Sequence, residues 1–269
     1  MSRILIITNG NYFACQILAE LFRVRASEIS SVIVVKGDYR GQTGVRAGLR
    51  LMQQMTLPYF LFKLTVYMLP TVLRVLRRKF AGFEHDVPML IRRWAPGATH
   101  ISVSRLNSSR VARFARGCCP DLIVSVSCPQ KIGAELLKIP RYGGINVHSA
   151  RLPAYAGLAP YFWVLANNEK STGVTVHRMT EKWDAGDILA QHDVPIEPRM
   201  SAFGLFRSLA ETGGRALIEG VDRALRGEAG EQQDLRKRSY YSHPRLADYV
   251  RLRRNGHSLI RWADVWLER

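Results

Sequence analysis

The first two dozen residues constrain the fold more than any other stretch of the chain. Residues 4–7 are consecutive apolar residues of β-forming type, and Gly10 separates them from residues 13–22, where apolar side chains recur at helical spacing. A strand that is apolar on both faces is typical of a parallel sheet with helices on both sides. A strand, a glycine turn and a helix form the first unit of a doubly wound α/β domain.

The same alternation continues along the chain. Further strands are expected at residues 31–35, 99–103, 121–126, 145–148, 172–179 and 188–194, and further helices at 107–115, from 133, at 161–167 and at 202–225. The first turn lacks a G-x-G-x-x-G pattern, so a dinucleotide site is not supported. The sequence therefore predicts an α/β fold, a Rossmann-like doubly wound and mostly parallel sheet, over residues 1–227.

Residues 46–80 interrupt this pattern. Leu57 to Leu76 is strongly apolar, but it contains Lys63 and two prolines, which argue against a membrane span. The basic flanks of this segment would suit a helix lying on a membrane surface, so a membrane-surface contact through 57–76 stays an alternative. We favour a helical insertion that packs on the core, covers the substrate site or contributes to a homodimer.

The net charge is unusual, at +17 with a pI near 10.3. Such a charge suits an anionic partner, for example a nucleic acid, a nucleotide-linked substrate or an acidic membrane. It is also typical of an arginine-rich solvated surface, which is the interpretation we favour over nucleic acid. The four cysteines form no C-x-x-C pair, and residues 1–10 show no signal-peptide pattern, so we expect reduced thiols, no metal and a cytoplasmic protein.

Two polar residues occupy the end of the strand expected at 145–148. Asn146 and His148 are two positions apart, so their side chains share one face of the strand. Asp184 and Asp187 follow in a glycine-containing turn. Asp187, like His177 on the strand before it, is expected to be structural or to support the residues that react. An amide, an imidazole and a carboxylate can stabilise an oxyanion, move a proton and orient the imidazole.

The region from about Pro120 to Asp187 resembles the folate-dependent formyltransferases, which act on glycinamide ribonucleotide, methionyl-tRNA or amino sugars. The resemblance lies in N-V-H-x-x-x-L-P-x-Y-x-G, G-V-T-V-H-x-M and D-A-G-D-I-L. It implies the formyltransferase fold, 10-formyltetrahydrofolate as the formyl donor, and no metal. It also implies Asn146, His148 and Asp184 as the catalytic residues.

The resemblance further implies where the donor and the acceptor bind. The loop after the strand at 121–126 matches one that surrounds the pterin ring through backbone groups. The residues assigned to the folate pocket are Cys128, Pro129, Gln130, Lys131, Ile132, Thr180 and Trp183. The candidate acceptor-binding residues are Asn9, Gly10, Asn11, Tyr12, Arg151 and Tyr155. Arg151 replaces a leucine of the family pattern, and is expected either to contact an anionic acceptor group or to be exposed.

The sequence therefore predicts an N-formyltransferase that acts on a small amine, such as a nucleotide-linked amino sugar or a specialised-metabolite amine. The methionyl-tRNA enzymes carry a C-terminal OB-type domain, which typically needs about a hundred residues. Residues 228–269 are expected to form only a short basic appendage, which makes tRNA a less favoured acceptor. A methionyl-tRNA formyltransferase-like enzyme and a formyltetrahydrofolate hydrolase, in which water replaces the amine, remain alternatives.

Overall fold

The computed structural model describes residues 1–266 except 39, 45–48, 50–52, 54 and 65–85. Its strands are β1 (Ile4–Thr8), β2 (Ile29–Val35), β3 (Thr99–Val103), β4 (Leu122–Val126), β5 (Gly144–His148), β6 (Ala156–Gly157), β7 (Ser171–Arg178), β8 (Ile188–Pro195) and β9 (Tyr240–Tyr241). Its helices include α1 (Tyr12–Val24), α4 (Val87–Trp94), α5 (Ser109–Cys118), α6 (Ala134–Leu137), α7 (Pro160–Ala166), α8 (Ala202–Leu225), α9 (Leu246–Arg254) and α10 (Trp262–Trp266).

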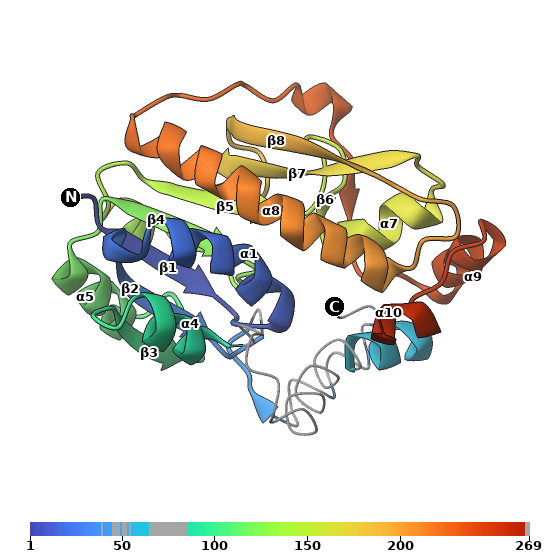
Figure 1. Cartoon of the computed structure of the whole chain (residues 1–269), viewed down its shortest axis with the longest axis horizontal. Helices are drawn as coiled ribbons and strands as arrows, with labels where there is room; N and C mark the ends of the chain where they lie inside the picture. The colour runs from blue at the N-terminus through green and yellow to red at the C-terminus, as the bar shows by residue number, and fades with distance from the viewer. Residues whose placement is uncertain (39, 45–48, 50–52, 54, 65–85, 267–269) are drawn as a thin grey trace.

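A seven-stranded sheet in the order β3-β2-β1-β4-β5-β7-β8 forms the centre of the fold (Figure 1). The strands from β3 to β5 pair in parallel, whereas β7 and β8 run antiparallel to their neighbours. The expected α/β, doubly wound and mostly parallel fold is therefore confirmed. The antiparallel pair matters for function, because it places β7 directly beside the polar end of β5.

Alternate residues of β1 reach two hydrophobic layers. Ile4 and Ile6 pack in the larger cluster, which contains buried residues of α1, α4 and α8. Leu5 and Ile7 pack in a second cluster with residues of α5 and α6. All four side chains have no exposed surface, because helices cover both faces of the sheet. Figure 1 shows α1 and α8 side by side across one face.

Local capping signals explain where several helices begin and end. Ser201 is the predicted N-cap of α8, and its hydroxyl accepts a hydrogen bond from the Gly204 amide at 2.9 Å. The helix ends at Leu225, and Gly227 follows with φ of +76°, a conformation that glycine adopts without strain. Helix α5 begins at Ser109, two residues later than predicted, because Ser108 provides the N-cap.

Helix α8 lies against β7 at Gly220 without space for a larger side chain. A Cβ atom there would lie 2.4 Å from Cγ1 of Val176. Gly220→Ala is therefore expected to lower the free energy of unfolding by about 1–3 kcal/mol, because overpacking displaces the helix or the strand. Gly117→Ala in α5 is the matched control: its Cβ would meet nothing within 4 Å, and it should raise stability by about 0.5–1 kcal/mol. Urea unfolding measures both, and equal effects would contradict the packing argument.

Only part of the predicted insertion at 46–80 is described. Residues 57–64 are helical, and Tyr59 and Phe62 on this helix are buried in the main core. The Tyr59 hydroxyl lies 3.0 Å from that of Tyr161 on α7. The described part thus packs on the core as expected, whereas the predicted segment from 65 to 76 lies outside the described residues. Within the described ranges, no helix combines the length and apolar character needed to cross a membrane.

Candidate active site

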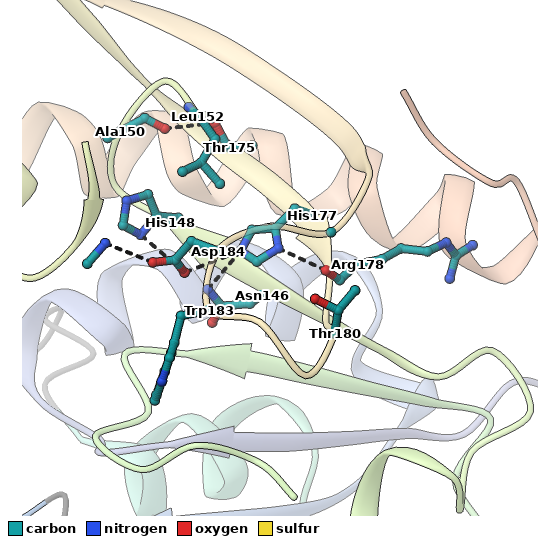
Figure 2. A network of polar contacts seen from close by, with 12 residues as sticks. Asn146, His148, Ala150, Leu152, Thr175, His177, Arg178, Thr180, Trp183 and Asp184 are labelled. Carbon is teal, nitrogen blue, oxygen red and sulfur yellow. Dashed lines mark hydrogen bonds and ion pairs between the residues drawn. The ribbon is translucent and has the colours of Figure 1, made fainter. Parts of the chain in front are cut away.

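The sheet brings the polar ends of two strands together. Asn146 and His148 lie on β5, and the antiparallel register places His177 of β7 directly opposite Asn146. Opposite residues of an antiparallel pair have side chains on the same face, so the three side chains form one group (Figure 2). Asp184 reaches this group from the loop between β7 and β8.

The carboxylate of Asp184 lies between the two imidazoles (Figure 2). Its Oδ1 atom is 3.8 Å from Nδ1 of His148 and 3.7 Å from Nε2 of His177. These distances exceed those of hydrogen bonds, so the attraction is one between charges when a ring is protonated. The other oxygen, Oδ2, accepts a hydrogen bond from the Gly157 amide at 2.9 Å.

Backbone carbonyls determine which nitrogen of each histidine carries a proton. Nε2 of His148 lies 2.8 Å from the carbonyl oxygen of Tyr155, and Nδ1 of His177 lies 2.9 Å from that of Arg178. A carbonyl oxygen only accepts, so these two nitrogens are the donors. The opposite nitrogens, which face Asp184, therefore carry a lone pair in the neutral rings and can take up a proton.

This tautomer also orients the amide of Asn146. Its Nδ2 atom lies 3.3 Å from Nε2 of His177, and the lone pair on that ring nitrogen makes the amide the donor. The amide nitrogen has a second N–H, which can donate to an oxygen that becomes negative during a reaction. His177 thus contacts both Asn146 and Asp184, which agrees with the supporting role that the sequence allowed beside a purely structural one.

Asp184 is held as an anion. Burial alone would raise the pKa of this carboxyl, whose side chain is 8% exposed, but His148, His177 and the Gly157 amide outweigh burial and hold its pKa well below the usual range. Its φ of +49° lies in the left-handed region, which is strained for a residue with a side chain. Such conformations persist where the surrounding structure imposes them.

The loop after β5 is anchored to β7. The Thr175 hydroxyl donates to the Ala150 carbonyl at 2.7 Å and accepts from the Leu152 amide at 3.1 Å (Figure 2). The Gln191 side chain donates to the same hydroxyl at 2.8 Å. These bonds fix the loop that returns the chain to Tyr155, whose carbonyl holds His148.

The loop after β4, predicted to hold folate, directs several side chains into the protein. Gln130 is 7% exposed; its amide donates to the carbonyls of Asp38 and Ser104 and accepts from the Leu106 amide. Ile132 belongs to the second hydrophobic cluster.

Because these side chains point inward, this part of the loop can offer a ligand mainly its backbone groups. Pro129 is half-buried and Lys131 is exposed. Burial raises the pKa of the Cys128 thiol to about 11, so it stays protonated at neutral pH and has no thiolate character.

The other two folate-pocket candidates lie on the β7–β8 loop. Both Thr180 and Trp183 are exposed, and the Thr180 hydroxyl donates to the Lys182 carbonyl at 3.0 Å. Trp183 precedes Asp184, and its indole extends away from the two histidines (Figure 2). An exposed aromatic ring beside this polar cluster is a suitable surface for a flat ring of a ligand.

The predicted acceptor residues between β1 and α1 have structural contacts of their own. The Asn11 side chain caps α1 by accepting from the Ala14 amide at 2.8 Å, and that of Asn9 accepts from the Asn11 amide. Gly10 has φ of +66°, which this turn requires. Tyr12 begins the helix and packs against the main core. The side-chain oxygens of both asparagines are therefore engaged with backbone amides.

Arg151 and Tyr155 also have partners. Arg151 is exposed and forms an ion pair with Asp193 on β8. The Tyr155 hydroxyl donates to Glu169 at 2.5 Å, and its ring stacks on Tyr241 with centroids 5.2 Å apart. The side chain of Tyr155 thus joins the C-terminal segment, while its carbonyl serves the histidine.

Sequence reasoning did not predict the contacts of His177 or the contribution of Gly157 to this cluster. His177 was singled out but not placed beside Asn146, although an antiparallel pairing of the two predicted strands would have suggested it. The Gly157 amide could not be found, because the approach of that turn to Asp184 depends on tertiary structure. Within the described ranges, no group of His, Cys, Asp and Glu side chains has the arrangement of a metal site.

His177→Leu tests the orientation of the amide. Without the ring acceptor, the Asn146 amide can rotate, and kcat for the formyl transfer predicted from the sequence is expected to fall by roughly tenfold, as for other partners that orient a reacting group. His192→Leu on β8 is the matched control, since His192 pairs with Glu219 at the surface. Steady-state kinetics compares them, and an equal effect of both substitutions would exclude the orienting role.

The fold and this cluster define a member of the formyl transferase family. The model of that family matches residues 3–221, and the chain belongs to it. The match includes β5, β7 and the loop that carries Asp184.

Two curated relatives and one solved structure illustrate the similarity. The bifunctional polymyxin resistance protein ArnA of Wigglesworthia glossinidia brevipalpis is 36% identical over 147 residues, which are 53% of this chain and 22% of that protein. The methionyl-tRNA formyltransferase of Halothermothrix orenii is 33% identical over 175 residues, 63% of this chain and 55% of that protein. The chain therefore spans about half or less of the length of these relatives.

The solved structure is an N-formyltransferase from Helicobacter canadensis in complex with folinic acid and dTDP-3-aminofucose. It is 17% identical with a TM-score of 0.55, and the alignment covers 90% of this chain and 71% of that chain. At this identity, the similarity concerns the fold.

Proposed function

We propose that the protein is an N-formyltransferase that moves a formyl group from 10-formyltetrahydrofolate to a small amine, with Asn146, His148 and Asp184 as its catalytic residues. The observation that carries the proposal is the convergence of these side chains at the end of β5, with Asp184 ionised. Membership of the formyl transferase family supports the reaction class.

The mechanism follows from the protonation pattern. The amine nitrogen attacks the formyl carbon, and the Asn146 amide donates its second N–H to the oxygen that becomes negative. Nδ1 of His148 is too far from Asp184 for a hydrogen bond, so its lone pair can accept the proton of the attacking nitrogen. Asp184 then stabilises the imidazolium. His148 returns the proton to the leaving nitrogen as the old carbon–nitrogen bond breaks.

The donor fits what the chain offers near this cluster. The donor supplies the formyl carbon, and the loop residues 128–132 offer it backbone groups beside the exposed indole of Trp183. The structure of the Helicobacter protein with folinic acid supports a folate-type ligand for this fold. We place the folate against this loop and against Thr180 and Trp183.

For the acceptor, we propose an amine carried on a nucleotide-linked sugar. The Helicobacter protein binds dTDP-3-aminofucose, and one sequence relative is a bifunctional polymyxin resistance protein. The turn at residues 9–12, Arg151 and Tyr155 are the proposed acceptor-binding positions. The second candidate acceptor is methionyl-tRNA, favoured by the net charge of +17 and by the methionyl-tRNA formyltransferases among the relatives.

The decisive experiment is to incubate the purified protein and formyl-folate with a panel of sugar nucleotides and small amines, and with charged initiator tRNA. Mass spectrometry of the acceptors should show the gain of one formyl group on a sugar nucleotide. Formylation of the tRNA alone would replace the first acceptor with the second. Release of formate without any formylated acceptor would indicate a hydrolase and overturn the transferase.

We further propose that residues 1–227 form the catalytic domain and that residues 228–269 are an appendage to it. We also propose that the protein is a cytoplasmic homodimer. Leu57, Leu61 and Leu64 are 46–65% exposed on the helix at 57–64 and provide an apolar face for such a contact. Sedimentation velocity should give a dimer that Leu61→Glu dissociates. Flotation with anionic vesicles tests the alternative that this face binds a membrane. A monomer that binds the vesicles would show that the face contacts a membrane surface and not a second subunit.

A further inference from the structure

Residues 231–241, here called the C-terminal strip, run back along the proposed active site after α8 ends. Glu231 exchanges two backbone hydrogen bonds with Ile188 of β8, both at 2.8 Å. At its other end, β9 pairs in parallel with β6. Figure 1 shows this chain passing over β8 and descending beside β6. The strip lies outside residues 3–221, the part that matches the formyl transferase family.

The strip holds the loop that carries Asp184. Gln233 is 7% exposed, and its amide nitrogen lies 2.6 Å from the carbonyl oxygen of Gly186 and 3.3 Å from that of Asp184. The Arg238 guanidinium donates to the carbonyl of Trp183 at 2.8 Å. Gln233 and Arg238 therefore bind backbone carbonyls before Asp184, after it and at Asp184 itself.

The same strip holds the turn that contacts both His148 and Asp184. The Ser239 hydroxyl accepts from the Tyr155 amide at 2.8 Å, and the Ser239 carbonyl accepts from the Ala156 amide at 2.9 Å. These bonds fix the residue whose carbonyl orients His148. They also fix the approach to Gly157, whose amide binds the carboxylate.

Both of these segments contain backbone that is strained on its own. Asp184 has φ of +49° and Tyr155 has φ of +58°, and such left-handed conformations are unfavourable for residues with a side chain and persist where the surroundings impose them. The donors and acceptors of the strip bind backbone groups of these two residues or of residues at most two positions away. The strip is thus placed to impose both conformations at once.

We propose that the C-terminal strip is a brace for the active site, and that Gln233, Arg238 and Ser239 are positioning residues for formyl transfer. They touch neither the formyl group nor the acceptor; they set the distance between Asp184 and His148. The proposal rests on the proposed function, because it assigns the brace to that catalytic group. A displacement of about 1 Å in such a group can cost roughly a hundredfold in rate.

Gln233→Leu is the principal test, with Gln232→Leu as the matched control on the exposed neighbouring position. Gln233→Leu should lower kcat ten- to a hundredfold with KM for both substrates within about threefold, because binding groups are untouched. Gln232→Leu should leave both constants unchanged. Arg238→Met should lower kcat as well, and Arg238→Lys, which keeps a donor for the Trp183 carbonyl, should restore most of it.

A second readout does not depend on turnover. With carboxyl-labelled aspartate, NMR titration should show Asp184 ionised well below its usual range in the wild type, and its midpoint should rise in Gln233→Leu. If Gln233→Leu does not fold, Ser239→Ala provides the same comparison through the Tyr155 turn.

Two outcomes separate the brace from the proposed function. An inactive Asp184→Asn together with a Gln233→Leu enzyme whose kcat equals that of Gln232→Leu would overturn the brace alone. Full activity of Asp184→Asn would overturn the catalytic assignment of Asp184, and a wild-type protein that formylates no acceptor would overturn the proposed function.

Discussion

Replacing Asn146 by alanine is expected to lower kcat by at least about a hundredfold, the usual cost of removing a donor to an oxyanion. The geometry supports this, because His177 accepts one N–H of the amide and so directs the nitrogen, not the oxygen, toward the reaction. Affinity for folinic acid, measured by calorimetry, should change by less than about threefold, since the folate is placed against a different loop.

Asn146→Asp provides the matched control for this prediction. It keeps the size of the side chain but replaces the donor with an anion that faces Asp184 and an incoming negative oxygen, so it should be at least as damaging as alanine. An aspartate variant that retains most of the activity would show that the amide is not the oxyanion donor.

The elements that local patterns predict were placed well. The helix at 202–225 has the same bounds in the structure, because a serine cap, a helical apolar period and Gly227 all lie within the segment. The strand at 99–103 is likewise unchanged. In contrast, β6 and β9 were not predicted, because each has two residues and forms only when segments about eighty positions apart meet.

The site shows the same division between local and tertiary information. Asn146 and His148 could be grouped from their spacing on one strand, since side-chain direction alternates locally. The contacts of His177 and Gln233 could not be predicted from local spacing, because they depend on the register of β7 and on the return of the chain after α8. Gln130 adds a further case: the resemblance placed it in the folate pocket through backbone groups, and the structure shows that its side chain is buried against other backbone groups.

Asp184→Asn is expected to lower kcat by roughly a hundredfold or more, because the imidazolium of His148 loses the charge that stabilises it. The substitution keeps the shape of the side chain and an acceptor for the Gly157 amide, so the loop should remain in place. Asp187→Asn in the same loop is the matched control, because Asp187 is not part of the cluster, and its kcat should stay within about twofold. Equal losses in both variants would indicate general damage to the loop.

The difference in stability between the wild type and the same variant should depend on pH in a defined direction. The pKa of Asp184 is depressed in the folded state relative to its usual value of 3.8. A depressed carboxyl contributes stability that is fully present above the unfolded-state pKa and is lost as pH falls through the folded-state pKa. The difference in unfolding free energy between wild type and Asp184→Asn should therefore be constant near pH 5 and shrink steadily below about pH 4. Urea titrations at several pH values measure it, and a difference that grows on acidification would mean that Asp184 is not held as an anion between the two histidines.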